Sequence, residues 1–138
     1  MSFTPAEAEY LAQQRLGRLA TIAPDGGLQN NPVGFWVNTE TGTIDIGGFN
    51  LGKSRKFHNI ERNGEIAFVV DDLVSIDPWR ARGVEIRGVA EALTDQAPHR
   101  PGMSAEVIRI HPRRILSWGI EPDHAGMHAR DVTGSDAH

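Results

Sequence analysis

The sequence contains no cysteine, and this absence narrows the chemistry that is open to the chain. Without cysteine the chain forms no disulfide framework, holds no zinc through thiolates and has no thiol nucleophile. The same absence fits a reducing compartment, so we expect a cytoplasmic protein.

Long apolar runs and an excess of positive charge are lacking as well. No apolar stretch approaches the roughly 20 residues that span a bilayer, and the N-terminus lacks the pattern of a signal peptide. The net charge of −4 argues against a general binder of nucleic acid or of anionic membranes. We therefore expect neither among the partners, and any bound anion must be held by a local cluster of cations.

Several catalytic and metal-binding motifs are missing too. The sequence has no P-loop, no dinucleotide Gly-x-Gly-x-x-Gly pattern and no serine on a nucleophile elbow, so no catalytic residue is identified. His124 and His128 have the spacing of two ligands on one helix face, but no glutamate lies between them and no third ligand is near. We expect no metal site.

Short strands with turn signals between them dominate what is present. At 138 residues the chain is long enough for one domain. Asp25-Gly26 is typical of a hairpin turn, and Thr4-Pro5 begins a helix that we expect to end near residue 14. A second short helix is expected between residues 52 and 64, and a loop over 71–82. The predicted strands are 19–23, 28–37, 43–48, 65–70, 83–93, 105–110 and 115–120.

About seven strands and two short helices indicate a mainly β (α+β) domain built as an antiparallel barrel. We place this single domain at residues 1–120. Residues 121–138 are polar and aperiodic, and we expect them to form a C-terminal tail.

The segment 52–63 is the most informative part of the sequence. It holds the only two lysines, Lys53 and Lys56, together with Ser54 and Arg55, in a chain that is acidic overall. A glycine before a helix start that carries lysine, serine and arginine is a good phosphate seat, because free amides, the helix dipole and charged donors converge there. The alternative is a solvated basic helix face. Gly48, at a glycine-rich strand end just before, would leave room for a flat ring.

A second candidate site is the strand segment around Asn31, Pro32 and Val33. Consecutive asparagines and a proline are poor strand formers, so something other than sheet stability favours them here. A polar strand that offers amides to the edge of a heteroaromatic ring explains them, and so does an edge strand with a bulge.

Three tryptophans complete the set of candidates. Trp36 lies on a strand and is expected in the core. Trp79, in a loop next to an arginine, lines a pocket or a dimer surface, or simply packs against the chain. Trp118, on the last predicted strand, covers a cofactor from a partner subunit or likewise simply packs.

Several segments resemble the pyridoxamine-phosphate-oxidase-like family. Gly17 to Ile22, Asp25-Gly26 and Asn31 to Val33 look like its opening hairpin, and Lys53 to Lys56 resemble its phosphate-binding segment. The segments 67–73, 78–80, 83–90 and 109–119 narrow the similarity to an actinobacterial subgroup described as probable F-420-dependent enzymes, which includes reductases of tetracycline biosynthesis. The resemblance covers about residues 5–120.

This resemblance implies a split β-barrel of the FMN-binding type, assembled as a homodimer with a cofactor in each interface cleft. It implies that Lys53, Ser54, Arg55 and Lys56 hold phosphate while Asn31, Pro32 and Val33 meet the ring. The expected activity is hydride transfer between reduced F-420, a deazaflavin, and a small organic acceptor. FMN is the alternative cofactor, and a non-catalytic flavin-, deazaflavin- or haem-binding protein is the alternative function.

Overall fold

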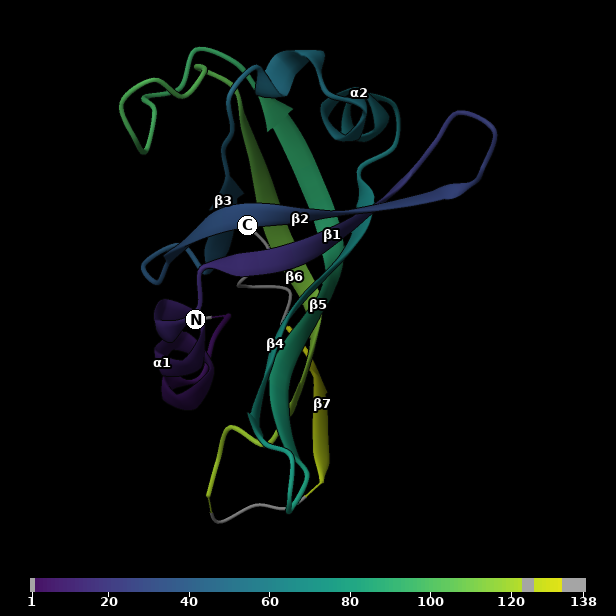
Figure 1. Cartoon of the computed structure of the whole chain (residues 1–138). Coiled ribbons are helices and arrows are strands. Elements are labelled where there is room, and N and C mark those ends of the chain that lie inside the picture. The colour runs from purple at the N-terminus through teal and green to yellow at the C-terminus, as the bar shows by residue number, and fades with distance from the viewer. Residues whose placement is uncertain (1, 123–125, 133–138) are drawn as a thin grey trace.

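The structure, a computed structural model, describes residues 2–122 and 126–132. Seven strands, two α-helices and one short 3-10 helix follow one another along the chain (Figure 1). In chain order they are α1 (Pro5–Gln13), β1 (Leu16–Ile22), β2 (Leu28–Asn38), β3 (Thr43–Ile46), η1 (Leu51–Lys53), α2 (Arg55–Arg62), β4 (Glu65–Ser75), β5 (Arg80–Leu93), β6 (Val107–Trp118) and β7 (Met127–Asp131).

The strands form one antiparallel sheet that closes into a barrel. Their order is β3-β2-β1-β4-β5-β6-β7, and an additional pairing between β3 and β6 joins the two sides. Six strands therefore make the barrel, with β7 added outside on β6. The predicted fold class, a mainly β split barrel with two short helices, is confirmed. Helix α2 lies across one end of the barrel, beside the tip of the β1–β2 hairpin (Figure 1).

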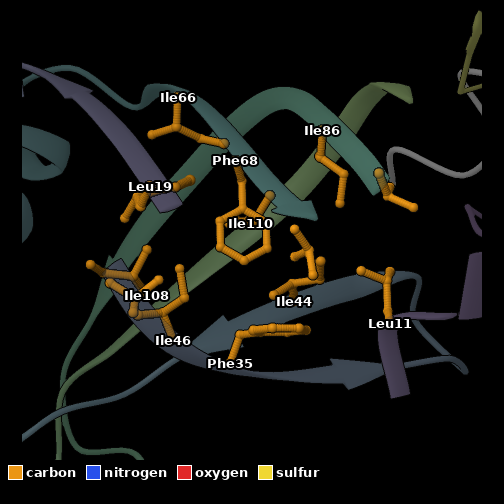
Figure 2. Packing of buried hydrophobic residues seen from close by; sticks show 14 of the residues in the cluster. Leu11, Leu19, Phe35, Ile44, Ile46, Ile66, Phe68, Ile86, Ile108 and Ile110 are labelled. Carbon is orange, nitrogen blue, oxygen red and sulfur yellow. The ribbon is translucent and has the colours of Figure 1, made fainter. Parts of the chain in front are cut away.

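The barrel interior is filled by aliphatic side chains around one aromatic ring. Phe68 of β4 is fully buried at the centre of the cluster that Figure 2 shows. The ring of Phe35 meets it edge-on, with the ring centroids 5.4 Å apart and the planes at 77°. Aromatic pairs prefer this geometry because the positive edge of one ring faces the negative face of the other. This packed core holds the barrel strands in place, including β2, which carries the candidate residues Asn31 and Pro32.

Helix α1 begins as the sequence predicts. Thr4 and Glu7 form a reciprocal capping box: the Glu7 amide donates to the Thr4 hydroxyl, and the Thr4 amide donates to Glu7 Oε1. Glu7 is buried, and its carboxylate also accepts a hydrogen bond from Arg130 of β7 at 2.5 Å. This ion pair ties the last strand to the first helix.

Three sequence-based predictions about the strands are wrong in part. The two strands expected over 105–120 are one strand, β6: Pro112 pairs with Gly88, and a register shift there leaves Arg113 without a partner on β5. The loop expected over 71–82 is mostly hairpin, because β4 and β5 pair from Asp71↔Gly83 to Ser75↔Arg80. Within the expected tail, residues 127–131 form β7, paired with β6. That the domain ends near residue 120 stays a prediction.

Candidate functional site

The chain turns sharply into α2, and Ser54 holds that corner. Asn50 adopts the left-handed conformation (φ 59°), η1 follows, and Ser54 caps α2. The Ser54 hydroxyl donates to the Leu51 carbonyl at 2.6 Å and accepts from the Phe57 amide at 3.3 Å. The Ser54 hydroxyl therefore already makes two hydrogen bonds within the turn, and its role here is to stabilise the start of α2.

A pocket of about 460 Å³ lies between α2 and the tip of the β1–β2 hairpin. Arg55, on the first turn of α2, is exposed there and faces the hairpin across the pocket. Asn59, one turn further along, is buried and donates to Gln29 Oε1 at 2.7 Å and to Thr21 Oγ1 at 3.0 Å, which fixes the helix against both strands. The lining residues are Ala23, Pro24, Asp25, Gln29, Arg55, His58 and Asn59.

The four residues of the predicted phosphate seat do not all face this pocket. Lys53 lines a second hollow, of about 530 Å³, on the other flank of α2. That hollow also contains the Glu106 carboxylate, which accepts a hydrogen bond from the Gly52 amide at 3.1 Å. The structure therefore separates Lys53 from Arg55. An anion in the first pocket meets the arginine, whereas one in the second meets the lysine beside an acidic group.

The predicted ring-binding strand has a free edge. Residues 28–34 of β2 pair with β1, whereas β3 pairs only from Phe35 onward, so across the described residues no strand covers the other edge of 28–34. Asn31 and Pro32 are exposed along this edge, and no register shift marks a bulge between β1 and β2. Val33 points into the core and is 6% exposed, so only its main chain is open to a ligand.

Of the remaining predicted site residues, Gly48 lies just before η1 and α2, whereas the two tryptophans lie apart from α2. The Gly48 carbonyl accepts hydrogen bonds from both the amide and the hydroxyl of Ser104, each at 3.0 Å, so this strand end is held by the segment before β6. Trp79 is exposed near the tip of the β4–β5 hairpin, and Trp118 lies on β6 opposite Gly83 and Met127. These tryptophans belong to the end of the molecule that carries β7, away from α2 (Figure 1).

The structure shows a polar cluster on β3 that the sequence analysis missed. Asp45 is 9% exposed and accepts two hydrogen bonds from Arg109 of β6, from Nε at 2.8 Å and from Nη2 at 3.0 Å. His99, in the segment between β5 and β6, places Nε2 3.2 Å from Asp45 Oδ2. The only signal in the sequence was a carboxylate, Asp45, between Ile44 and Ile46 of a predicted strand.

The electrostatics of this cluster predict an acid-sensitive contribution to stability. Burial by itself raises the pKa of Asp45, but the hydrogen bonds and charges of Arg109 and His99 lower it below its ordinary value. Because the folded-state pKa is the lower one, the carboxylate stabilises the fold above about pH 4, and this stabilisation is lost as pH falls through the folded-state pKa.

We therefore expect the free energy of unfolding, measured in urea between pH 7 and pH 3, to fall on the acid side. Asp45→Asn cannot ionise at this position, so its acid-side fall should be shallower than that of the natural chain. Parallel curves for the two proteins would contradict this assignment.

Other classes of site find no support in residues 2–122 and 126–132. No group of three or more histidine, aspartate or glutamate side chains in these ranges could hold a metal ion. His124, one of the two histidines with ligand spacing, lies outside the described residues. No helix in these ranges is both long and apolar enough to cross a membrane.

Known proteins match the chain along nearly its whole length. The family model for pyridoxamine 5'-phosphate oxidase matches residues 3–133. A protein of Streptomyces rimosus subsp. rimosus, 5a,11a-dehydrotetracycline/5a,11a-dehydrooxytetracycline reductase, is 50% identical over 138 residues, covering 99% of this chain and 97% of its own.

Solved structures show the same fold. A conserved hypothetical protein of Mycobacterium tuberculosis is 26% identical with a TM-score of 0.69, and the alignment covers 98% of this chain and 95% of that one. An F420 reductase is 22% identical with a TM-score of 0.58, covering 74% of this chain and 89% of its own.

Proposed function

The chain belongs to the pyridoxamine 5'-phosphate oxidase family, and we propose that it is a reductase that moves a hydride from reduced F-420 to an organic acceptor. The 50% identity to a named reductase over almost the full length of both chains supports an oxidoreductase. We further propose which cofactor the chain binds, which residues bind it, and that a homodimer encloses it.

One observation carries the choice of site: an exposed arginine and a free strand edge lie on either side of one hairpin. Arg55 reaches the pocket beside the hairpin tip, and Gln29, two residues before Asn31, lines the same pocket. A molecule with a phosphate at one end and a flat heteroaromatic ring at the other fits this arrangement. The phosphate would meet the guanidinium, and the ring edge would meet backbone groups of β2 that no strand uses.

The protein groups bind and orient rather than react. Arg55 provides a charge-assisted bond to phosphate, Lys53 and Lys56 add positive charge around the helix start, and the free edge of β2 holds the ring in one orientation. Asn59 keeps α2 at a fixed distance from β1 and β2 through its two hydrogen bonds. When bound, F-420 would supply the hydride and water would supply the proton that the reduced acceptor takes up, so the proposal assigns no catalytic acid or base to the chain.

The name of the Streptomyces rimosus relative suggests the acceptor class. That protein is a reductase of 5a,11a-dehydrotetracycline and 5a,11a-dehydrooxytetracycline. Because the identity extends over the whole chain, we extend the class, though not the individual compound, to this protein. The acceptor would be a planar, conjugated polycycle that bears carbonyl or enol oxygens.

A homodimer belongs to the same proposal. Several large apolar side chains are exposed, and four of them gather at the β4–β5 hairpin, which is unusual for a surface that only water covers. A second copy packed there would bury them, and in the proposed dimer Trp79 and Trp118 would face the neighbouring subunit. The exposed set is Leu16, Leu28, Phe49, Leu73, Val74, Ile76, Trp79 and Met127.

A side-by-side titration tests the cofactor, and a turnover assay tests the activity. F-420 and FMN are each titrated into the protein and followed by fluorescence, while sedimentation of the same sample gives the assembly state. Reduced F-420 is then mixed with 5a,11a-dehydrotetracycline, and we expect its oxidation to be faster with the protein than without.

Tighter binding of FMN than of F-420 would mean that FMN is the cofactor, while the proposed binding site would stand. Tight F-420 binding without turnover on any acceptor would instead favour a non-catalytic carrier, and binding of haem alone would reject the reductase.

A further inference from the structure

Another pocket, of about 360 Å³, opens beside the Asp45 cluster, apart from the two hollows that flank α2. It is lined by residues 36–40 of the chain together with Asp45 and His99. Trp36 of β2 and His99 form one wall: their rings are stacked, with centroids 4.5 Å apart and planes at 9°. Arg100 lies over the same tryptophan, 5.9 Å from its ring centre. Trp36 is only half-buried, so the expectation that it belongs to the core is wrong.

The histidine in this wall is held in a fixed orientation. Its Nε2 is bound by Asp45, its ring is clamped on Trp36, and the segment that carries it is anchored where Ser104 bonds Gly48. Among the described residues Nδ1 of His99 has no hydrogen-bond partner, so this nitrogen is left for a ligand. A polar atom fixed by an aromatic stack and a buried carboxylate is the kind of group that sets the orientation of a bound molecule.

The floor that leads from this wall toward the ring-binding edge has no side chain. Side chains alternate along β2, so Pro32, Gly34 and Trp36 lie on one face while Val33 and Phe35 enter the core. A Cβ built on Gly34 would meet only the Arg15 carbonyl, at 3.9 Å. The space beside the Gly34 backbone is therefore open to a ligand atom, and a flat molecule bound against Trp36 can extend over it.

The 31–33 edge of β2 and the surface at Trp36 are close enough together for a cofactor ring and an acceptor to lie side by side. Val33 and Trp36 are three residues apart on an extended strand, which is about 10 Å at roughly 3.3 Å per residue. The segment between β5 and β6 that carries His99 lies at the same end of the barrel as α2 (Figure 1). A ring on the 31–33 edge and a molecule over Gly34 would thus be neighbours.

We propose that the surface formed by Gly34, Trp36 and His99 is the acceptor site, which takes a planar, conjugated molecule with an enol O–H that donates to His99 Nδ1. This inference rests on the proposed function, since the acceptor must lie next to the cofactor. The glycine floor selects for flatness, and the tryptophan wall provides an apolar edge for the polycycle. Arg100 favours acceptors whose enol groups carry partial negative charge. The charged groups around the site are Glu40, Asp45, Arg100 and Arg109.

Two variants test the site from different sides. Gly34→Val places a branched side chain on the floor, in space that the chain leaves open, and His99→Gln removes the imidazole. We expect each to weaken equilibrium binding of 5a,11a-dehydrotetracycline, followed by tryptophan fluorescence quenching, by about tenfold or more. F-420 affinity, titrated separately, should change less than about twofold in His99→Gln. The matched control is His111→Gln, whose imidazole bonds Glu91 on the outside of the barrel and should leave both affinities unchanged.

The outcomes separate this inference from the function on which it rests. If the natural chain oxidises reduced F-420 with this acceptor and both variants bind the acceptor as well as the natural chain does, the site is wrong and the function stands. If the natural chain binds neither F-420 nor the acceptor, both fall. Circular dichroism establishes that each variant is folded, and Gly34→Val decides alone if His99→Gln is not.

Discussion

Arg55→Ala should weaken F-420 binding by about tenfold or more, because it removes a charge-assisted hydrogen bond worth about 1.5–3 kcal/mol. Arg55 is the one cationic side chain of the segment 53–56 that lines the pocket beside the β1–β2 hairpin. Its side chain is exposed, so the substitution leaves no cavity and no buried partner. A fluorescence titration of F-420 measures the change, and FMN affinity should fall in parallel if the two cofactors share the phosphate seat.

The two flanks of α2 provide the internal comparison. Lys53 lies in the other hollow, near Glu106, so we expect Lys53→Ala to cost less than Arg55→Ala, and the double variant to lose at least as much as Arg55→Ala alone. Arg113→Ala is the control for charge, since among the described residues the exposed guanidinium of Arg113 pairs with Glu65 alone, at 3.3 Å on the surface. A larger loss from Lys53→Ala would move the phosphate to the second hollow.

Local signals explain which parts of the fold the sequence could predict. Asp25-Gly26 marks the first hairpin, Thr4 and Glu7 mark the start of α1, and the basic segment does precede and begin a helix. The predictions that failed concern strands whose limits depend on pairing with distant parts of the chain. Pro112 suggested a break, but a register shift accommodates it in β6, and β7 is held by pairing with β6 and by the Glu7–Arg130 ion pair rather than by any apolar pattern of its own.

The site divides in the same way. Sequence reasoning located the helix start and the polar strand, because their unusual residues are contiguous. It could not foresee that Lys53 and Arg55 point to different hollows, which depends on η1 and on the corner at Ser54. Nor could it assemble Asp45, His99 and Arg109, which meet only because β3 pairs with β6 and closes the barrel.

Phe68→Ala should produce the largest loss of stability in the chain, about 3–5 kcal/mol, as large-to-small substitutions of a buried phenylalanine do. The ring is fully buried and sits at the centre of the cluster in Figure 2, between β1, β5 and the strands opposite. The six strands closed around it leave little freedom to collapse into the cavity. The free energy of unfolding of a single domain is about 5–15 kcal/mol, so this loss would leave the variant close to unfolding. Urea denaturation followed by circular dichroism measures the loss.

A variant at Gly17 tests whether the Phe68 ring packs directly against β1. A Cβ on Gly17 would lie 2.3 Å from Phe68 Cζ and 2.5 Å from Cε1, so Gly17→Ala alone should destabilise the chain by about 1–3 kcal/mol through overpacking. Phe68→Leu shortens the side chain and opens the space that the new methyl needs. The double variant should therefore lose less stability than the sum of the two single variants, by about 0.5–3 kcal/mol. Strictly additive losses would mean that the ring does not press on β1 in solution.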